Sequence, residues 1–188
     1  MRLRDGKADY GWISIGLHWI GVVLVWTMLF VGDSIGGPGA ELQSAMLKLH
    51  TTIGLSLYAV FWARVLWRAK VGHPQPLPRQ KRLYYRVGKV FHYLLLAGIA
   101  AMLISGPLMA WSGAIPLRLF DLVVPSPIPE SPGLFAAMRG LHAAGAAVLG
   151  WGSLVHVMAV IKHTVVDRDG ALDKIMVPLE KPGLPPTV

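Results

Sequence analysis

Histidines are the residues of this chain whose type and spacing could do chemistry. His142 and His156 lie fourteen residues apart within one apolar segment. In an α-helix this separation gives a rise of roughly 21 Å and a direction within about 40° of the starting one. Both imidazoles would therefore point from one helix face at two depths. The alternative is two unrelated histidines that satisfy their ring nitrogens inside a helical bundle.

The composition is too apolar for an ordinary soluble protein, because 54% of the 188 residues are hydrophobic and only 15% are charged. The chain contains no cysteine, which excludes disulfides, cysteine-ligated iron–sulfur clusters and covalent haem attachment. A bound metal must therefore use His, Met or carboxylate ligands. The formal charge of +8 comes from basic residues beside long apolar runs, which indicates membrane topology signals rather than nucleic-acid binding.

Four apolar segments are each long enough to cross a membrane as an α-helix. We expect helices at about residues 11–31, 43–70, 87–111 and 135–166. The first segment is too long for the apolar part of a signal peptide and has no convincing cleavage site after it. The sequence thus predicts an all-α fold, an integral membrane four-helix bundle that forms a single domain over residues 1–188.

Prolines mark the irregular parts of this predicted bundle. The pair Gly106-Pro107 predicts a kink in the third helix. The apolar patch 117–124 lies among prolines and is too short to span a membrane, so it predicts an interfacial loop or half-helix. Pro178 and Pro182 predict an irregular tail.

Positive charge distinguishes the two ends of the predicted helices. Of the eighteen Lys and Arg residues, fifteen lie at the end that carries both termini, and only Lys48, Arg118 and Arg139 lie at the other. Lys and Arg are in excess on the cytoplasmic side of membrane proteins. We therefore expect both termini in the cytoplasm.

With this topology four histidines fall at two depths. His18 and His156 lie towards the cytoplasmic ends of the first and fourth helices, while His50 and His142 lie near the outer ends of the second and fourth. Ionisable residues inside lipid are costly and usually functional. Two level pairs suit two haems, each held between two imidazoles, whereas a metal cage would gather the histidines at one depth.

Small residues accompany these histidines at helical spacing. Gly54 follows His50 by four residues, and Gly145 follows His142 by three. Gly152 precedes His156 by four. Such residues could let a porphyrin lie flat against the backbone, or they could mediate ordinary contact between membrane helices.

Other polar residues are expected near the cytoplasmic pair. Arg64 could pair with a haem propionate, hold a quinone carbonyl or snorkel to the surface. His92 is either an alternative ligand or a polar group beside a haem and a quinone pocket, and the second is favoured because two axial ligands are already present. We expect His73 to be solvated and His163 to be solvated or to face a propionate. Further quinone-site candidates are Tyr84, Tyr85, Arg86 and Lys89. At the outer face, Lys48 and Arg139 could neutralise propionates or steer a small anion.

The sequence resembles the bacterial cytochrome b561 family, which is itself similar to the cytochrome b subunits of nickel–iron hydrogenase and formate dehydrogenase. The resemblance covers nearly the whole chain. It rests on segments 14–19, 49–50 and 64–68, on His92, His142 and His156, and on the tail 169–178.

This resemblance implies a multi-pass protein of the bacterial inner membrane with two b haems, one ligated by His18 and His156 and the other by His50 and His142. It implies electron transfer between a periplasmic donor, such as superoxide or a redox protein, and membrane ubiquinone or menaquinone. The chain would then be a superoxide:quinone type oxidoreductase or an electron-transfer cytochrome. A haem-carrying membrane anchor that passes electrons from a partner dehydrogenase or hydrogenase to quinone is the alternative.

Overall fold

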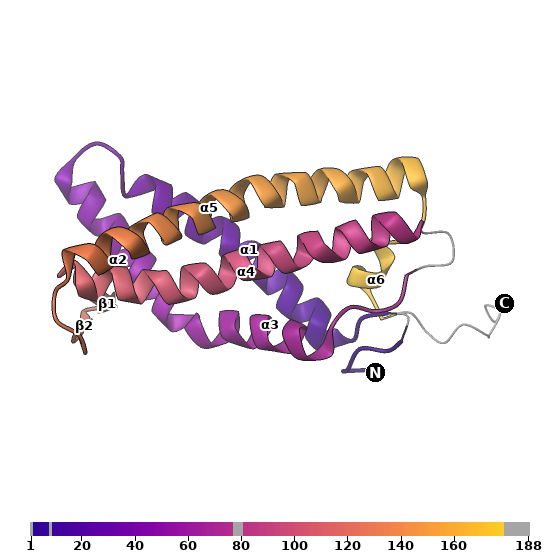
Figure 1. Ribbon diagram of the computed structural model, residues 1–188, viewed down its shortest axis with the longest axis horizontal. Coiled ribbons are helices and arrows are strands. Elements are labelled where there is room, and N and C mark those ends of the chain that lie inside the picture. The colour runs from indigo at the N-terminus through magenta and orange to yellow at the C-terminus, as the bar shows by residue number, and fades with distance from the viewer. Residues whose placement is uncertain (1, 8, 77–80, 179–188) are drawn as a thin grey trace.

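The computed structural model describes residues 2–7, 9–76 and 81–178, and it is built mainly from long helices packed side by side (Figure 1). The elements in chain order are α1 (Trp12–Ser34), α2 (Ala40–Ser56), α3 (Tyr58–Val71), α4 (Arg82–Ser112), β1 (Leu117–Leu119), β2 (Leu122–Val124), α5 (Pro132–Ile161), the π-helical turn η1 (Lys162–Asp167) and α6 (Asp173–Met176).

Three of these helices, α1, α4 and α5 with η1, are long and apolar enough to cross a membrane. The helices α2 and α3 together would make a fourth span, bent by 50°. The sequence predicts one helix over 43–70, and the structure instead breaks it at Leu57, which adopts φ −107° and ψ 7°. Leucine is a good helix former, so the residue type does not signal this break.

The core lies where α3, α4 and α5 meet. Its buried members are Phe61, Val65, Ile99, Leu103 and Leu149. Many other large apolar side chains are exposed, as expected for helices whose outer faces contact lipid.

Glycines allow close approach of the helices around this core. A Cβ atom added to Gly145 would lie 2.9 Å from the sulfur of Met102, and one added to Gly152 would lie 2.6 Å from Leu95 Cδ2. One added to Gly54 would lie 3.3 Å from Met28 Cε. Close helix contact, one of the two roles that the sequence leaves open for these glycines, is therefore present in the structure.

Pro107 lies within α4, and the helix continues through it. Proline has no N–H group, so the carbonyl of Leu103, four residues earlier, loses its usual helical partner. The hydroxyl of Tyr58 on α3 donates a hydrogen bond to this carbonyl at 3.2 Å. A neighbouring helix thus satisfies a backbone group that lipid could not.

The segment 117–124 forms an antiparallel hairpin, so the half-helix that the sequence allowed is wrong. Leu117 pairs with Val124, and Leu119 pairs with Leu122. The hairpin is tied to α2, where the hydroxyl of Thr52 accepts a hydrogen bond from the backbone N–H of Phe120 at 3.1 Å. Short apolar runs fit strands and helices equally well by periodicity, which explains the error.

At the opposite end of the molecule, the N-terminal segment, the connection before α4 and the C-terminal segment meet (Figure 1). The backbone N–H of Gln75 donates to the carbonyl of Lys7, and the ammonium of Lys174 donates to the carbonyl of Gln75, both at 2.8 Å. The indole of Trp19 donates to the carbonyl of Ile175 at 3.0 Å. The predicted irregular tail therefore contains a docked helix, α6, while Pro182 lies outside the described residues.

We expect Tyr58→Phe to lower the free energy of unfolding by about 1 to 3 kcal/mol, the usual cost of a buried unsatisfied polar group. Thermal unfolding of the purified protein in detergent measures this change. In a Pro107→Ala background the new N–H can bond to Leu103, so Tyr58→Phe should cost less there. An equal cost in both backgrounds would contradict the compensating role of Tyr58.

Candidate functional site

Two histidine pairs face each other across the helices. His50 of α2 faces His142 of α5 with ring centroids 6.3 Å apart and an interplanar angle of 70°. His18 of α1 faces His156 of α5 at 6.3 Å and 69°. The first pair lies towards the hairpin end of α5 and the second towards the end that carries η1. The structure brings the four histidines together in the combinations expected from the sequence.

The spacing within each pair suits one metal ion between two imidazoles. An imidazole nitrogen binds a metal at about 2 Å, so two rings on opposite sides of one ion have centroids about 6 Å apart. Each pair offers two imidazoles, and histidine is an axial ligand of haem iron. The donor set and its spacing therefore fit a haem between the rings of each pair.

Glycines, which have no side chain, lie against both rings of the His50–His142 pair. We call this the outer pair because it lies towards the hairpin end of α5. A Cβ atom added to Gly32 of α1 would lie 3.3 Å from His50 Cε1. One added to Gly106 of α4 would lie 3.4 Å from His142 Cε1. Sequence reasoning singled out glycines on the ligands' own helices and missed these two, because they lie on other helices.

A serine on α4 also contacts the outer pair. The hydroxyl oxygen of Ser105 lies 3.0 Å from His142 Nδ1. On the other side of the pair, His50 Nδ1 is buried without a hydrogen-bond partner among the described residues. Sequence reasoning missed Ser105, and the available signal was a single polar residue within the apolar stretch of α4.

Arg64 of α3 contacts the His18–His156 pair, which we call the inner pair. Its guanidinium donates to the carbonyl of Leu17 at 2.8 Å, and its Nη2 lies 3.3 Å from His18 Nδ1. Gly21 makes room for it, since an added Cβ atom would lie 2.9 Å from Arg64 Cδ. A guanidinium only donates, so His18 Nδ1 accepts here and its Nε2 carries the proton. Ligation through Nε2 therefore requires Arg64 to release Nδ1.

His92 of α4 adjoins the inner pair without matching its spacing. Its ring centroid lies 5.0 Å from that of His156. Two rings on opposite sides of one metal ion should have centroids about 6 Å apart, and this separation is shorter. By spacing, His18 is the better partner for His156, and His92 is a polar neighbour of the pair.

His73 was expected to be solvated, and the structure instead shows it half-buried. Its ring stacks on His92 with centroids 5.4 Å apart and an interplanar angle of 19°, and it lies edge-on to Tyr93 at 5.0 Å. Its Nδ1 is buried without a partner among the described residues. Burial, together with the positive charges of Arg68 and Lys89, lowers the pKa of His73 to about 4. The connection before α4 folds back over α4, which a count of prolines does not reveal.

His163 is half-buried and contacts two aspartates. Its Nδ1 lies 2.7 Å from a carboxylate oxygen of Asp169 and 3.3 Å from one of Asp167. These contacts hold the chain where it turns after η1.

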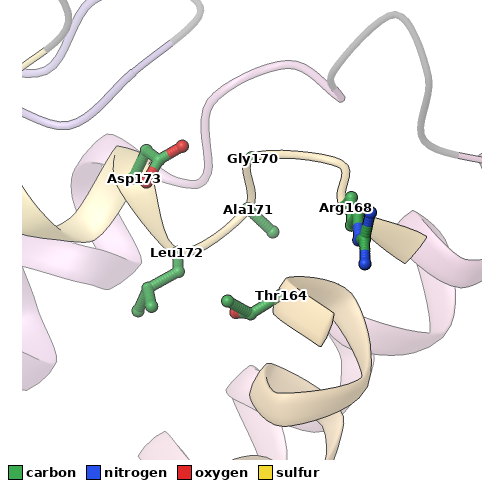
Figure 2. A pocket seen from close by; sticks show the side chains of 6 residues that line it. All are labelled: Thr164, Arg168, Gly170, Ala171, Leu172 and Asp173. Atoms are coloured by element: carbon green, nitrogen blue, oxygen red, sulfur yellow. The ribbon is translucent and has the colours of Figure 1, made fainter. Parts of the chain in front are cut away.

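Figure 2 shows a pocket beside this turn, and none of the paired histidines lines it. Its lining residues are Thr164, Arg168, Gly170, Ala171, Leu172 and Asp173.

The remaining predicted polar residues are distributed over the two ends. Lys48 forms an exposed ion pair with Asp121 of the hairpin at 2.5 Å. Arg139 is exposed. The ammonium groups of two lysines lie near the Tyr84 ring. The distance to the ring centroid is 5.7 Å for Lys81 Nζ and 5.0 Å for Lys162 Nζ.

The other candidates named with Tyr84 lie along the first turns of α4. The Tyr85 hydroxyl donates to the carbonyl of Pro74 at 2.8 Å and so closes the connection before α4. Arg86 is exposed, and Lys89 is half-buried. Neither tyrosine hydroxyl donates to a residue of the inner histidine pair in the part of the chain that the structure describes.

Acid should destabilise the protein partly through His73. Below about pH 6.5 the unfolded chain takes up a proton on this residue, whereas the folded chain does so only near pH 4. Stability is therefore lost as the pH falls through this window. We expect the melting temperature of His73→Gln to fall less between about pH 7 and pH 4.5 than that of the unmodified protein. Equal losses would contradict the burial of His73.

Comparison with known proteins identifies the family. Residues 9–178 match the sequence profile of prokaryotic cytochrome b561. The chain is 30% identical over 186 residues to cytochrome b561 homolog 2 of Escherichia coli strain K12, covering 94% of this chain and 95% of that protein. It is 21% identical over 170 residues to the probable superoxide oxidase CybB of Yersinia pestis, covering 89% and 95% of the two chains. This multi-pass protein of the bacterial inner membrane therefore belongs to the prokaryotic cytochrome b561 family, whose members bind haem b and transfer electrons.

Proposed function

We propose that the chain crosses the membrane four times as a four-helix bundle, with both termini in the cytoplasm. The bent pair of α2 and α3 supplies the fourth span, beside α1, α4 and α5. The first described residues, the connection before α4 and α6 share one end of the molecule (Figure 1). Most of the Lys and Arg residues lie at that end, which supports its assignment to the cytoplasm.

Each histidine pair holds one haem b in this proposal. His50 and His142 bind the periplasmic-side haem, and His18 and His156 bind the cytoplasmic-side haem. The observation that carries the proposal is the matching geometry of two independent pairs, each with ring centroids 6.3 Å apart. Bound haem supplies one-electron transfer at each pair, and the protein determines spacing, potential and access.

The cytoplasmic side is the place where a membrane quinone, ubiquinone or menaquinone, accepts electrons. Arg64 supports this assignment, because its guanidinium is half-buried beside His18 and its Nε has no partner among the described residues. Once released from His18, the guanidinium can pair with a propionate or donate to a quinone carbonyl. His92 offers a second polar group within the same region.

The periplasmic donor in this proposal is superoxide. The name of the Yersinia pestis relative, probable superoxide oxidase, suggests this substrate. Oxidation of two superoxide anions to dioxygen yields the two electrons that, with two protons, reduce one quinone to a quinol. Arg139 is exposed at this face and carries the positive charge that attracts a small anion.

Single substitutions test the assignment of the ligands. We expect His142→Ala and His156→Ala each to remove one of two haems, because each deletes one axial ligand of a separate site. His92→Ala should retain both haems, because its ring is a neighbour of the pair. Haem content per chain and the reduced-minus-oxidised visible spectrum measure the outcome. Loss of a haem in His92→Ala with retention of both in His18→Ala would contradict the inner pairing.

An activity assay tests the direction and the substrates. We expect the purified protein, mixed with superoxide and a water-soluble quinone analogue, to form quinol faster than the two reagents do alone. Arg64→Gln should slow quinone reduction more than haem reduction by superoxide. A protein that contains haem but accelerates neither step would instead match a membrane anchor for a partner dehydrogenase or hydrogenase.

A further inference from the structure

Ser105 of α4 is fully buried, with 0% of its surface exposed, and the proposed function assigns it no role. Its hydroxyl oxygen lies between two polar groups. It is 2.6 Å from the carbonyl oxygen of Ala101, one turn earlier in α4, and 3.0 Å from Nδ1 of His142 on α5. One serine hydroxyl therefore joins the backbone of α4 to the imidazole of the outer pair.

The direction of these two hydrogen bonds follows from counting hydrogens. A serine hydroxyl has one hydrogen to donate and two lone pairs that accept. The carbonyl of Ala101 can only accept, so the Ser105 hydroxyl donates its hydrogen to this carbonyl. The hydroxyl oxygen then accepts from His142, whose Nδ1 must carry a proton.

This arrangement selects one tautomer of His142. A neutral imidazole carries a single proton, so a proton on Nδ1 leaves the lone pair on Nε2 free. Nε2 is then the nitrogen that can bind a metal, and the hydrogen bond at Nδ1 restrains rotation of the ring. Gly106 lies against the same ring, since a Cβ atom there would be 3.4 Å from His142 Cε1.

We propose that Ser105 is a positioning residue for the periplasmic-side haem: its hydroxyl fixes the tautomer and orientation of His142 and tunes the reduction potential at that site. The inference rests on the proposed ligand role of His142. An imidazole that donates from one nitrogen is a more electron-rich ligand at the other. Such a ligand favours the oxidised, more positively charged iron, so loss of the hydrogen bond should raise the potential.

The outer pair is asymmetric in this respect. His50 Nδ1 is buried without a hydrogen-bond partner among the described residues, whereas His142 Nδ1 has Ser105. Among the described residues, the contact between His142 and Ser105 is therefore the one side-chain hydrogen bond that orients an imidazole of this pair. Its removal should be felt at this site and not at His18 and His156.

Ser112 provides a matched control on the same helix. It is 2% exposed, and its hydroxyl donates to the carbonyl of Leu108, one turn earlier, at 2.6 Å. This is the same local hydrogen bond that Ser105 makes to Ala101. The Ser112 hydroxyl has no histidine partner among the described residues, so Ser112→Ala removes an equally buried hydroxyl without touching a ligand.

The experiment compares Ser105→Ala, Ser105→Thr and Ser112→Ala in the haem-loaded protein by redox titration of the visible bands and by electron paramagnetic resonance. The haem absent from His142→Ala identifies the signal to follow. In Ser105→Ala its reduction equilibrium should shift towards the reduced form by about tenfold, which corresponds to about 59 mV for one electron. The other haem should keep its potential. Ser105→Thr keeps a hydroxyl and should restore the potential, and Ser112→Ala should match the unmodified protein.

Selective loss of that haem in Ser105→Ala, with both haems kept in Ser112→Ala, would also support the positioning role. Two unchanged potentials in Ser105→Ala, or an equal shift in Ser112→Ala, would overturn it and leave the proposed function standing. Retention of both haems in His142→Ala would overturn the proposed ligand set itself. The two failures are therefore distinguishable.

Discussion

A polar group inside a membrane must find its partner within the protein, because lipid offers neither donors nor acceptors. This constraint organises the middle of α4. Pro107 leaves the carbonyl of Leu103 without its helical donor, and Tyr58 of α3 supplies one. Two residues away, Ser105 links α4 to the imidazole of His142. One short stretch of α4 thus joins the core helices to the outer histidine pair.

The same constraint explains why the histidines are informative. An imidazole deep in an apolar bundle is costly unless it is paired or bound to a metal. The two pairs have nearly the same separation and interplanar angle, although the histidines that face α5 come from different helices, α1 and α2. Packing alone gives no reason for two pairs to share this geometry, whereas a shared type of cofactor does. The arrangement places two histidine pairs of matching geometry at two positions along α5.

Sequence reasoning predicted the helical spans and the pairing of the histidines because both depend on regular helical geometry. A separation of fourteen residues fixes depth and direction along one helix, and topology then supplies the partner from another. The break at Leu57, the hairpin over 117–124 and the burial of His73 were missed. Leucine does not signal a helix break, and a short apolar run fits a strand and a helix equally well. The partial burial of His73 depends on its packing against α4, which periodicity does not report. Ser105 was missed for a related reason, since a lone serine in an apolar helix is also typical of ordinary helix packing.

Quantification of haem b per chain in the purified, haem-replete protein tests the two-site arrangement most directly. The geometry of the two pairs predicts two haems per chain, each with the visible and electron paramagnetic resonance spectra of low-spin iron between two imidazoles. One haem per chain, or two haems of which one is high-spin with a single histidine ligand, would contradict it.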